Sequence, residues 1–440
     1  MVSNVETEGK HPGVLATLRA TPSSARYLLG GIFIIQAGSL VQAFIVLYLA
    51  QRGFSIGHAA AALTAYSIGA TVGNLLGGEL THRVGPRATV AGTMACCAVL
   101  VAAIPVLSRP ALFSYLIATV ALAGLVAQCY RPAAATLLSE VMPEEHHVMS
   151  FSMMRVALNT GATVGPLIAA GLILINWDLL FVLNAVTALL YAAVAYFLLP
   201  ATRPAHDPKK AVEARRSAYL VLLRDVRYQL YLLSGVISAA VYVQFLSVLP
   251  LKITSEGGPT ALYSIVLAQS SLILVLTEMK ITTYTRRWRP RLVVATGSLL
   301  LGLGIAAYTP ATGSGVTIIL GTFVFVFGVM VSGPTAFAYP AKFPPHLRAR
   351  YLGAKYATFG LGLALGPAVG VLVWQAVGSR SFLFFGAATI VAAACALVGM
   401  RDDVQRQFPA EEGVVPDARP AGEVRPAGGV RSADDARAST

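Results

Sequence analysis

The stretch RPAAATLLSEVMPEEHHVMSFSMMRVALNTGATVGPLI, residues 131–168, is matched by a second stretch of the same chain, GPTAFAYPAKFPPHLRARYLGAKYATFGLGLALGPAVG, residues 333–370. Prolines and glycines recur at offsets of 202 and 201 residues: Pro132 with Pro334, Pro143 with Pro345, Gly161 with Gly362, Gly165 with Gly366, and Pro166 with Pro367. Repetition of this kind indicates that one structural unit was duplicated. The sequence therefore predicts two halves of matching structure.

The rest of the chain is strongly apolar. Of its 440 residues 56% are hydrophobic and only 12% are charged, whereas about 25% of the residues in a soluble domain are charged. Apolar runs long enough to cross a bilayer as helices occur at twelve places: 27–50, 59–80, 88–107, 112–138, 148–175, 179–199, 229–251, 260–283, 291–308, 315–339, 348–375 and 381–400. The sequence predicts an all-α integral membrane protein with two pseudo-symmetric six-helix bundles.

Polar segments set the expected domain boundaries. We expect an N-terminal cytoplasmic segment at 1–26, bundles at 27–200 and 229–400, a basic cytoplasmic linker at 201–228 and a disordered cytoplasmic tail at 401–440. Apolar linker residues recur every three or four positions, so the linker is either a helix on the membrane surface or a solvated tether. The first 25 residues lack the features of a cleaved signal peptide, so the first span is expected to remain.

The net charge of +13 has a topological explanation. With the N-terminus inside, most of the 33 Lys and Arg residues fall on the cytoplasmic side of the predicted spans. The positive-inside rule then places both termini in the cytoplasm and the protein in the cytoplasmic (inner) membrane. Because topology accounts for the basic surplus, nucleic-acid binding is not expected.

Enzyme chemistry and metal binding have no support in the sequence. Cys96, Cys97, Cys129 and Cys395 all fall inside predicted spans, without a CxxC motif or histidines at metal-ligand spacing, so no disulfide framework or metal site is expected. The sequence has no Walker loop, HExxH or GxSxG motif, so neither ATP hydrolysis nor other catalysis is expected, and no cofactor.

The second and third spans are joined by the basic turn GGELTHRVGPR, residues 77–87. Two six-span halves with such a turn resemble the major facilitator superfamily, whose loop signature reads Gly-x-Leu-x-Asp-Arg-x-Gly-Arg-Lys or Arg. This chain has Gly78, Leu80, Arg83, Gly85 and Arg87 at the matching positions. Small residues such as Gly78 let helices approach closely and Gly85 permits a tight reversal, although a plain basic turn would explain the arginines alone.

The turn departs from the signature at His82, where the family has aspartate. The resemblance implies that this carboxylate helps to latch the two halves together by meeting the N-terminus of span eleven. A protonated imidazole would be repelled by that helix dipole. We therefore expect either a weaker, acid-sensitive latch or a histidine that only caps the loop.

Span five carries Gly161-x-x-x-Gly165-Pro166, preceded by Asn159 and Arg155. In the superfamily a Gly-Pro element in span five marks the proton-driven drug antiporters. Residues 131–166 and the span-seven stretch YVQFLSVLPL, residues 242–251, look like those twelve-span multidrug exporters. The branch usually has an arginine in the middle of span four, where this chain has Val120, so the usual proton-handling arginine is absent.

Charged residues inside predicted spans are few. Glu278 is the carboxylate well inside a span, and the basic residues are Arg131, Arg155, Lys280 and Lys355. A buried ionisable group in a membrane costs at least about 2.5 kcal/mol, so a role in proton coupling or gating is expected for Glu278, Arg155, Arg131 and Lys355. The superfamily arrangement implies that span five faces span eight, where Arg155 could pair with Glu278 as a gate or a proton carrier. A static pair, or snorkelling of Glu278 and Lys280, is the alternative.

The superfamily cavity is lined mainly by spans one, four, seven and ten. In this chain these spans offer Gln36, Gln42, Phe44, Gln128, Tyr130, Tyr242, Gln244 and Phe245, with Phe323, Phe325 and Phe327. Aromatic rings and amides without fixed charge suit a lipophilic, neutral or weakly polar ligand. Ordinary helix packing is the alternative for each residue.

Together these features predict a monomeric secondary transporter that exports small lipophilic compounds by alternating access in exchange for protons. Its expected partners are a small-molecule substrate, protons and membrane lipid. A proton-coupled uptake permease for a nutrient or peptide is a second reading, and a non-transporting receptor or scaffold is a third.

Overall fold

The computed structural model describes residues 19, 21–201, 221–258, 260–310 and 315–402. All regular secondary structure in these ranges is helical, as predicted. Most of the predicted linker helix within 201–228, nearly all of the predicted segment 1–26 before Thr21, and the predicted tail beyond Asp402 lie outside the described residues. The described part of the linker is helical at residues 221–224.

The helices of the first half follow the predicted spans. They are α2 (Ser23–Gly38), α3 (Val41–Gln51), α4 (Ile56–Val84), α5 (Pro86–Leu107), α6 (Phe113–Val141), α7 (His147–Ile175) and α8 (Leu179–Leu198), with short 3-10 turns η1 (Pro110–Leu112) and η2 (Glu144–His146). The predicted span 27–50 is divided into α2 and α3. Gly85 ends α4 with a φ of 87°, which glycine adopts freely, and Pro86 begins α5, so this residue pair makes the tight reversal expected there.

The second half repeats this succession. It consists of α10 (Val226–Tyr242), α11 (Gln244–Ser247), α12 (Leu249–Ser255), α13 (Thr260–Thr285), α14 (Pro290–Ala306), α15 (Val316–Ala338), α16 (Pro345–Val377) and α17 (Ser381–Gly399), with η3 (Tyr339–Lys342) and η4 (Gly378–Arg380). The predicted span 229–251 is divided among α10, α11 and α12. The repeated prolines Pro132, Pro166, Pro334 and Pro367 lie inside helices.

Length and apolarity make this a multi-pass membrane protein. Within the described residues, ten helical stretches are long and apolar enough to cross a membrane. One of them, Pro345–Gly399, contains both α16 and α17, and α14 is a shorter apolar helix of 17 residues. The twelve crossings and the cytoplasmic position of the termini stay predictions.

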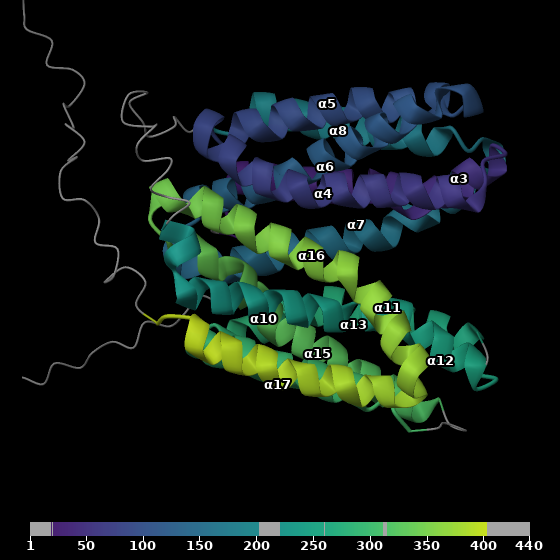
Figure 1. Ribbon diagram of the computed structural model, residues 1–440. Coiled ribbons are helices and arrows are strands. Elements are labelled where there is room, and N and C mark those ends of the chain that lie inside the picture. Colours follow the sequence, from purple (N-terminus) through teal and green to yellow (C-terminus); the bar gives the residue numbers. More distant parts are fainter. Residues whose placement is uncertain (1–18, 20, 202–220, 259, 311–314, 403–440) are drawn as a thin grey trace, which may run out of the picture.

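Helix packing repeats between the halves. In the first half α4 and α5 pack on α6, α5 packs on α8, and α2 packs on α7 and α8. In the second half the corresponding pairs are α13 and α14 on α15, α14 on α17, and α10 on α16 and α17. Figure 1 shows the first half above the second, with α7 and α16 between them. The duplication seen in the sequence therefore extends to the neighbours of each helix.

In the described residues the halves meet mainly through four pairs of α-helices. These are α4 with α16, α7 with α13, α7 with α15, and α6 with α16. The first two pairs are equivalent under the repeat, because α4 corresponds to α13 and α7 to α16. Both pairs make polar contacts toward the C-terminal ends of α4 and α13, near Arg83, Arg87, Arg286 and Arg287. We call this the basic end of the molecule.

Candidate functional site: a cavity between the halves

At the basic end, α4 packs closely against α16 at two glycines, Gly78 and Gly353. A Cβ atom on Gly78 would lie 2.8 Å from the carbonyl oxygen of Ala349 and 3.0 Å from the Cα atom of Gly353. The two backbones can pack this closely only because both positions lack a side chain. Gly78 of the loop signature is therefore a contact point between the halves.

Glu79 adds an ion pair to the contact between α4 and α16. Its Oε2 accepts a hydrogen bond from Nε of Arg350 at 2.9 Å, and its Oε1 accepts one from Nε of Arg83 at 2.8 Å. The Arg350 side chain is only 3% exposed. Because a buried guanidinium is stabilised chiefly by a close carboxylate, Glu79 holds the start of α16 against the end of α4.

The family resemblance places the latch carboxylate at position 82, but the carboxylate that meets α16 in this chain is Glu79, three positions earlier. His82 lies half-buried in the last turn of α4. Leu80 is also half-buried on this turn, and Arg87 donates a hydrogen bond to the Tyr196 carbonyl of α8. Glu79 was missed because the family signature leaves its position variable; an acidic residue in a basic turn was the available signal.

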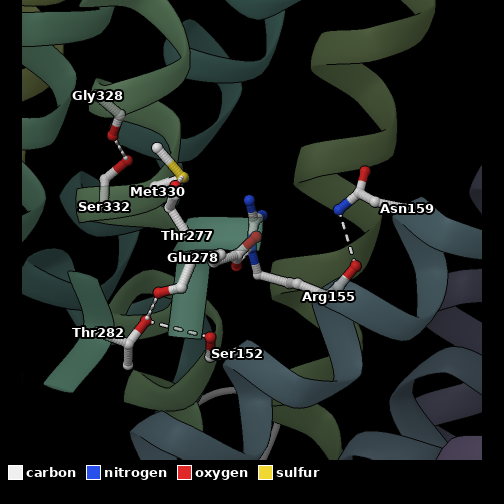
Figure 2. Close-up of polar contacts among 9 residues, drawn as sticks. All are labelled: Ser152, Arg155, Asn159, Thr277, Glu278, Thr282, Gly328, Met330 and Ser332. Carbon is white, nitrogen blue, oxygen red and sulfur yellow. Dashed lines mark hydrogen bonds and ion pairs between the residues drawn. The ribbon is translucent and has the colours of Figure 1, made fainter. Parts of the chain in front are cut away.

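The second contact joins α7 to α13. Nε of Arg155 donates to Oε1 of Glu278 at 2.5 Å, and Glu278 is completely buried. A second bond crosses the same interface, from Oγ1 of Thr282 to Oγ of Ser152 at 3.1 Å. Figure 2 shows both residues of α7 reaching toward α13, with Asn159 bonded back to the Arg155 carbonyl. Arg155 and Glu278 thus form an inter-half ion pair, and burial rules out snorkelling for Glu278.

A cavity of about 250 Å³ adjoins this ion pair. Residues of α2, α6 and α7 line it from the first half, and residues of α10, α13, α14, α15 and α16 line it from the second. Gly333 of α15 leaves room for the Arg155 guanidinium, because a Cβ there would lie 2.8 Å from its Nε. The arginine of the inter-half ion pair therefore lines the cavity, and Glu278 lies behind it.

The predicted cavity residues divide into two groups. Gln36 and Tyr242 line the cavity, as does Asn159 of the span-five motif. Residues that lie outside this cavity are Gln42, Phe44, Gln128, Tyr130, Gln244, Phe245, Phe323, Phe325 and Phe327. Tyr130 packs edge-on against Tyr191, and Phe245 stacks on Phe325.

These predicted residues lie outside the cavity because the sequence does not show which face of a membrane helix is turned toward it. Gln244 is fully buried and donates to the Gly366 carbonyl of α16 at 2.9 Å, so its amide serves helix packing. Gly366, like Gly161 and Gly165 of α7, lies against a neighbouring helix; the two α7 glycines face α2. The span-five motif therefore makes contacts inside its own half, as its spacing suggested.

Fixed charge also lines the cavity, contrary to the expected neutral lining. Arg131 and Lys355 are both lining residues. Nη2 of Arg131 donates to Oε1 of Gln36 at 3.2 Å. Lys355 is 3% exposed and places Nζ 5.0 Å from the ring centroid of Tyr231. Lys280, by contrast, is exposed on α13 and does not line the cavity.

Two repeated helical halves that enclose a cavity inside a membrane protein are the architecture of a secondary transporter. The chain belongs to the Major Facilitator Superfamily, whose family model matches residues 27–354. This confirms the resemblance seen in the loop signature.

Individual relatives are more distant. The chain is 25% identical over 398 residues to a Na(+), Li(+), K(+)/H(+) antiporter of Planococcus maritimus, covering 83% of this chain and 92% of that protein. It is 25% identical over 358 residues to the uncharacterized MFS-type transporter YqjV of Bacillus subtilis, covering 79% and 85%. The crystal structure of the fucose:proton symporter of E. coli aligns with a TM-score of 0.69 at 16% identity, over 85% of this chain and 98% of the symporter. The last likeness shows the fold alone.

Proposed function

We propose that this protein is a proton-coupled secondary transporter that exports small organic molecules through the central cavity by alternating access. The observation that carries the proposal is the buried Arg155–Glu278 pair, which joins α7 to α13 and whose arginine lines the cavity. An ion pair in this place is broken whenever the two halves separate at the basic end. Cargo binding and separation of the halves would therefore act on the same residues.

Proton coupling is expected because a buried carboxylate without its cation is energetically unfavourable. Separating the pair leaves the Glu278 carboxylate buried without its cation, and breaking a buried pair in this way costs about 3–5 kcal/mol. Protonating the carboxylate removes the charge, so the halves can part without that cost. Oε2 of Glu278, which has no hydrogen-bond partner within the described part of the chain, would be the atom that takes the proton.

Export in exchange for protons rests on two further observations. The Gly161 to Pro166 element of α7 is of the kind associated with drug antiporters, and the Planococcus relative is named an antiporter. That name also makes alkali cations a second candidate cargo. The basic residues Arg131 and Lys355 on the cavity wall disfavour that cargo, because like charges repel strongly where water is scarce.

The test uses the full chain reconstituted in liposomes with an imposed proton gradient and a panel of dyes and antibiotics. Glu278→Gln should abolish uphill movement but retain downhill exchange of the same compound. Lys280→Gln on the exposed face of α13 is the matched control and should behave like the wild type. Retained uphill transport by Glu278→Gln would contradict the proton-carrier role of Glu278. Accumulation of the compounds instead of their efflux would indicate an uptake permease.

A further inference from the structure

We propose that the central cavity binds an organic anion, whose acidic group is held between Arg131 and Lys355 while its apolar body lies against the cavity wall. This inference rests on the proposed function, because it takes the cavity as the place where cargo binds. It replaces the neutral ligand that the sequence favours.

The charge balance of the cavity is the first observation. Its lining includes three basic residues, Arg131, Arg155 and Lys355, and none of its lining residues is acidic. Arg155 is neutralised by Glu278. Arg131 and Lys355 make no ion pair with any residue that the structure describes. Two basic groups therefore face the cavity without a counter-charge.

Lys355 is positioned by aromatic rings rather than by an acceptor. Its Nζ lies 5.0 Å from the ring centroid of Tyr231, 5.3 Å from that of Phe337 and 5.9 Å from that of Phe359. Gly235 leaves space beside it, since a Cβ there would lie 2.6 Å from Nζ. Ring faces attract a cation but accept none of its three N–H donors in the ordinary way. Its donors remain available to a ligand.

Arg131 is incompletely bonded. Its contact with Gln36 occupies one Nη donor, and its buried Nε has no partner within the described residues. A guanidinium presents its donors as a planar fork that matches a carboxylate bidentately. Gln36 lies beside this fork and also lines the cavity, so its amide could bind the remaining oxygen of a small acid.

The rest of the wall suits an apolar body. Leu158, Leu274, Leu301 and Phe359 are among its lining residues. A small inorganic anion would leave this apolar surface in contact with water, whereas an aromatic or aliphatic acid would cover it. A basic pair set in an apolar wall thus selects organic anions over both inorganic anions and lipophilic cations.

Ligand binding to the purified full chain in a non-ionic detergent tests the inference. Thermal unfolding can be followed by reaction of the buried thiols of Cys97 and Cys129 with a dye. The probes are a panel of aromatic and aliphatic monocarboxylates, each with its neutral amide and corresponding amine. We expect carboxylates to raise the unfolding temperature while their amides and amines do not. Equal stabilisation by acid and amide, or none by any acid, would overturn the inference.

Variants locate the site. Lys355→Gln and Arg131→Gln should remove the shift caused by carboxylates, whereas Lys280→Gln should keep it. Lys355→Met should also raise the unfolding temperature of the ligand-free protein, because it removes a buried charge that lacks a partner. A lower unfolding temperature for that variant, with the carboxylate shift intact, would contradict the proposed role of Lys355.

The same probes separate this inference from the proposed function. Proton-driven transport of amides and acids alike would be consistent with the proposed transport function but would refute selectivity for anions. Carboxylate binding that depends on Arg131 and Lys355, without proton-driven transport of any bound compound, would keep the anion site and refute the transport mechanism.

Discussion

The two ion pairs at the basic end join equivalent helices of the repeat but differ in burial. Glu79 of α4 pairs with Arg350 of α16, and Glu278 of α13 pairs with Arg155 of α7. The Glu79 side chain is 12% exposed and bonds to two arginines, whereas that of Glu278 is completely buried and its partner Arg155 lines the cavity. One pair therefore resembles a latch at the rim, and the other is placed where cargo and protons could act on it.

Removing the partner of the deep pair should have the largest effect. Arg155→Gln leaves the Glu278 carboxylate buried without a cation, which should lower the free energy of unfolding by about 3–5 kcal/mol. The measurement is denaturant unfolding in mixed micelles. The double variant Arg155→Gln with Glu278→Gln should recover most of this loss. A double variant as unstable as the single one would show that the pair is not what stabilises the α7–α13 contact.

Close packing at the rim should be the next most sensitive feature. In Gly78→Ala the new Cβ would lie 2.8 Å from the Ala349 carbonyl oxygen, so α4 and α16 must move apart. We expect a loss of about 1–3 kcal/mol, the usual cost of overpacking, and faster reaction of cysteine probes placed between these helices. Gly92→Ala is the control, because no atom lies within 4 Å of a Cβ at that position. Equal stability of the two variants would refute the close contact.

The rim pair itself should contribute less than the deep one. Glu79→Gln leaves Arg350 nearly buried with a weaker acceptor, for an expected loss of about 1–2 kcal/mol. Transport should persist, with the basic end open for a larger share of the time. A loss as great as that of Arg155→Gln would erase the contrast between the pairs. His82→Asp addresses the acid-sensitive latch separately: an unchanged pH profile of transport would remove that expectation.

A pair at the opposite end should have the smallest effect. Burial would raise the pKa of Asp178, but hydrogen bonds from Arg52 and Tyr48, with the charge of Arg52, hold that pKa below its ordinary value. A depressed carboxyl pKa stabilises the fold above the unfolded-state value of about 3.9 and is lost as pH falls through the folded value. Asp178→Asn should therefore cost only about 0.5–1 kcal/mol at neutral pH. The difference should begin to shrink below about pH 4 and disappear once the pH lies below the folded value, and a constant difference between pH 3 and 7 would contradict this account.

The repeat and the charge pattern were sufficient to predict much of this structure. Apolar length predicted the helices, and the family's helix pairing brought Arg155 of span five to Glu278 of span eight. Glycine spacing in span five predicted close contact, which Gly161 and Gly165 make with α2. These features depend on the length of apolar runs, on the spacing of glycines and on the few charged residues inside spans, all of which are visible in the sequence.

The side chains that line the cavity could not be read in the same way. In a membrane helix the lipid-facing and core-facing surfaces are both apolar, so the sequence does not show how a span is rotated. Gln244 and Tyr130 therefore looked like cavity residues although they pack against neighbouring helices. Lys355 was expected to have a role, but its aromatic surroundings could not be predicted, because Tyr231 and Phe337 come from α10 and α15.

Cross-linking α7 to α13 tests the central claim, that these helices separate at the basic end in each transport cycle. Oγ of Ser152 and Oγ1 of Thr282 are 3.1 Å apart across that interface, so Ser152→Cys with Thr282→Cys, in a chain lacking its four native cysteines, should form a disulfide on oxidation. We predict that the oxidised protein in liposomes stops transporting and that a reductant restores transport, while each single variant is unaffected by oxidation. Full transport by the oxidised double variant would contradict the account.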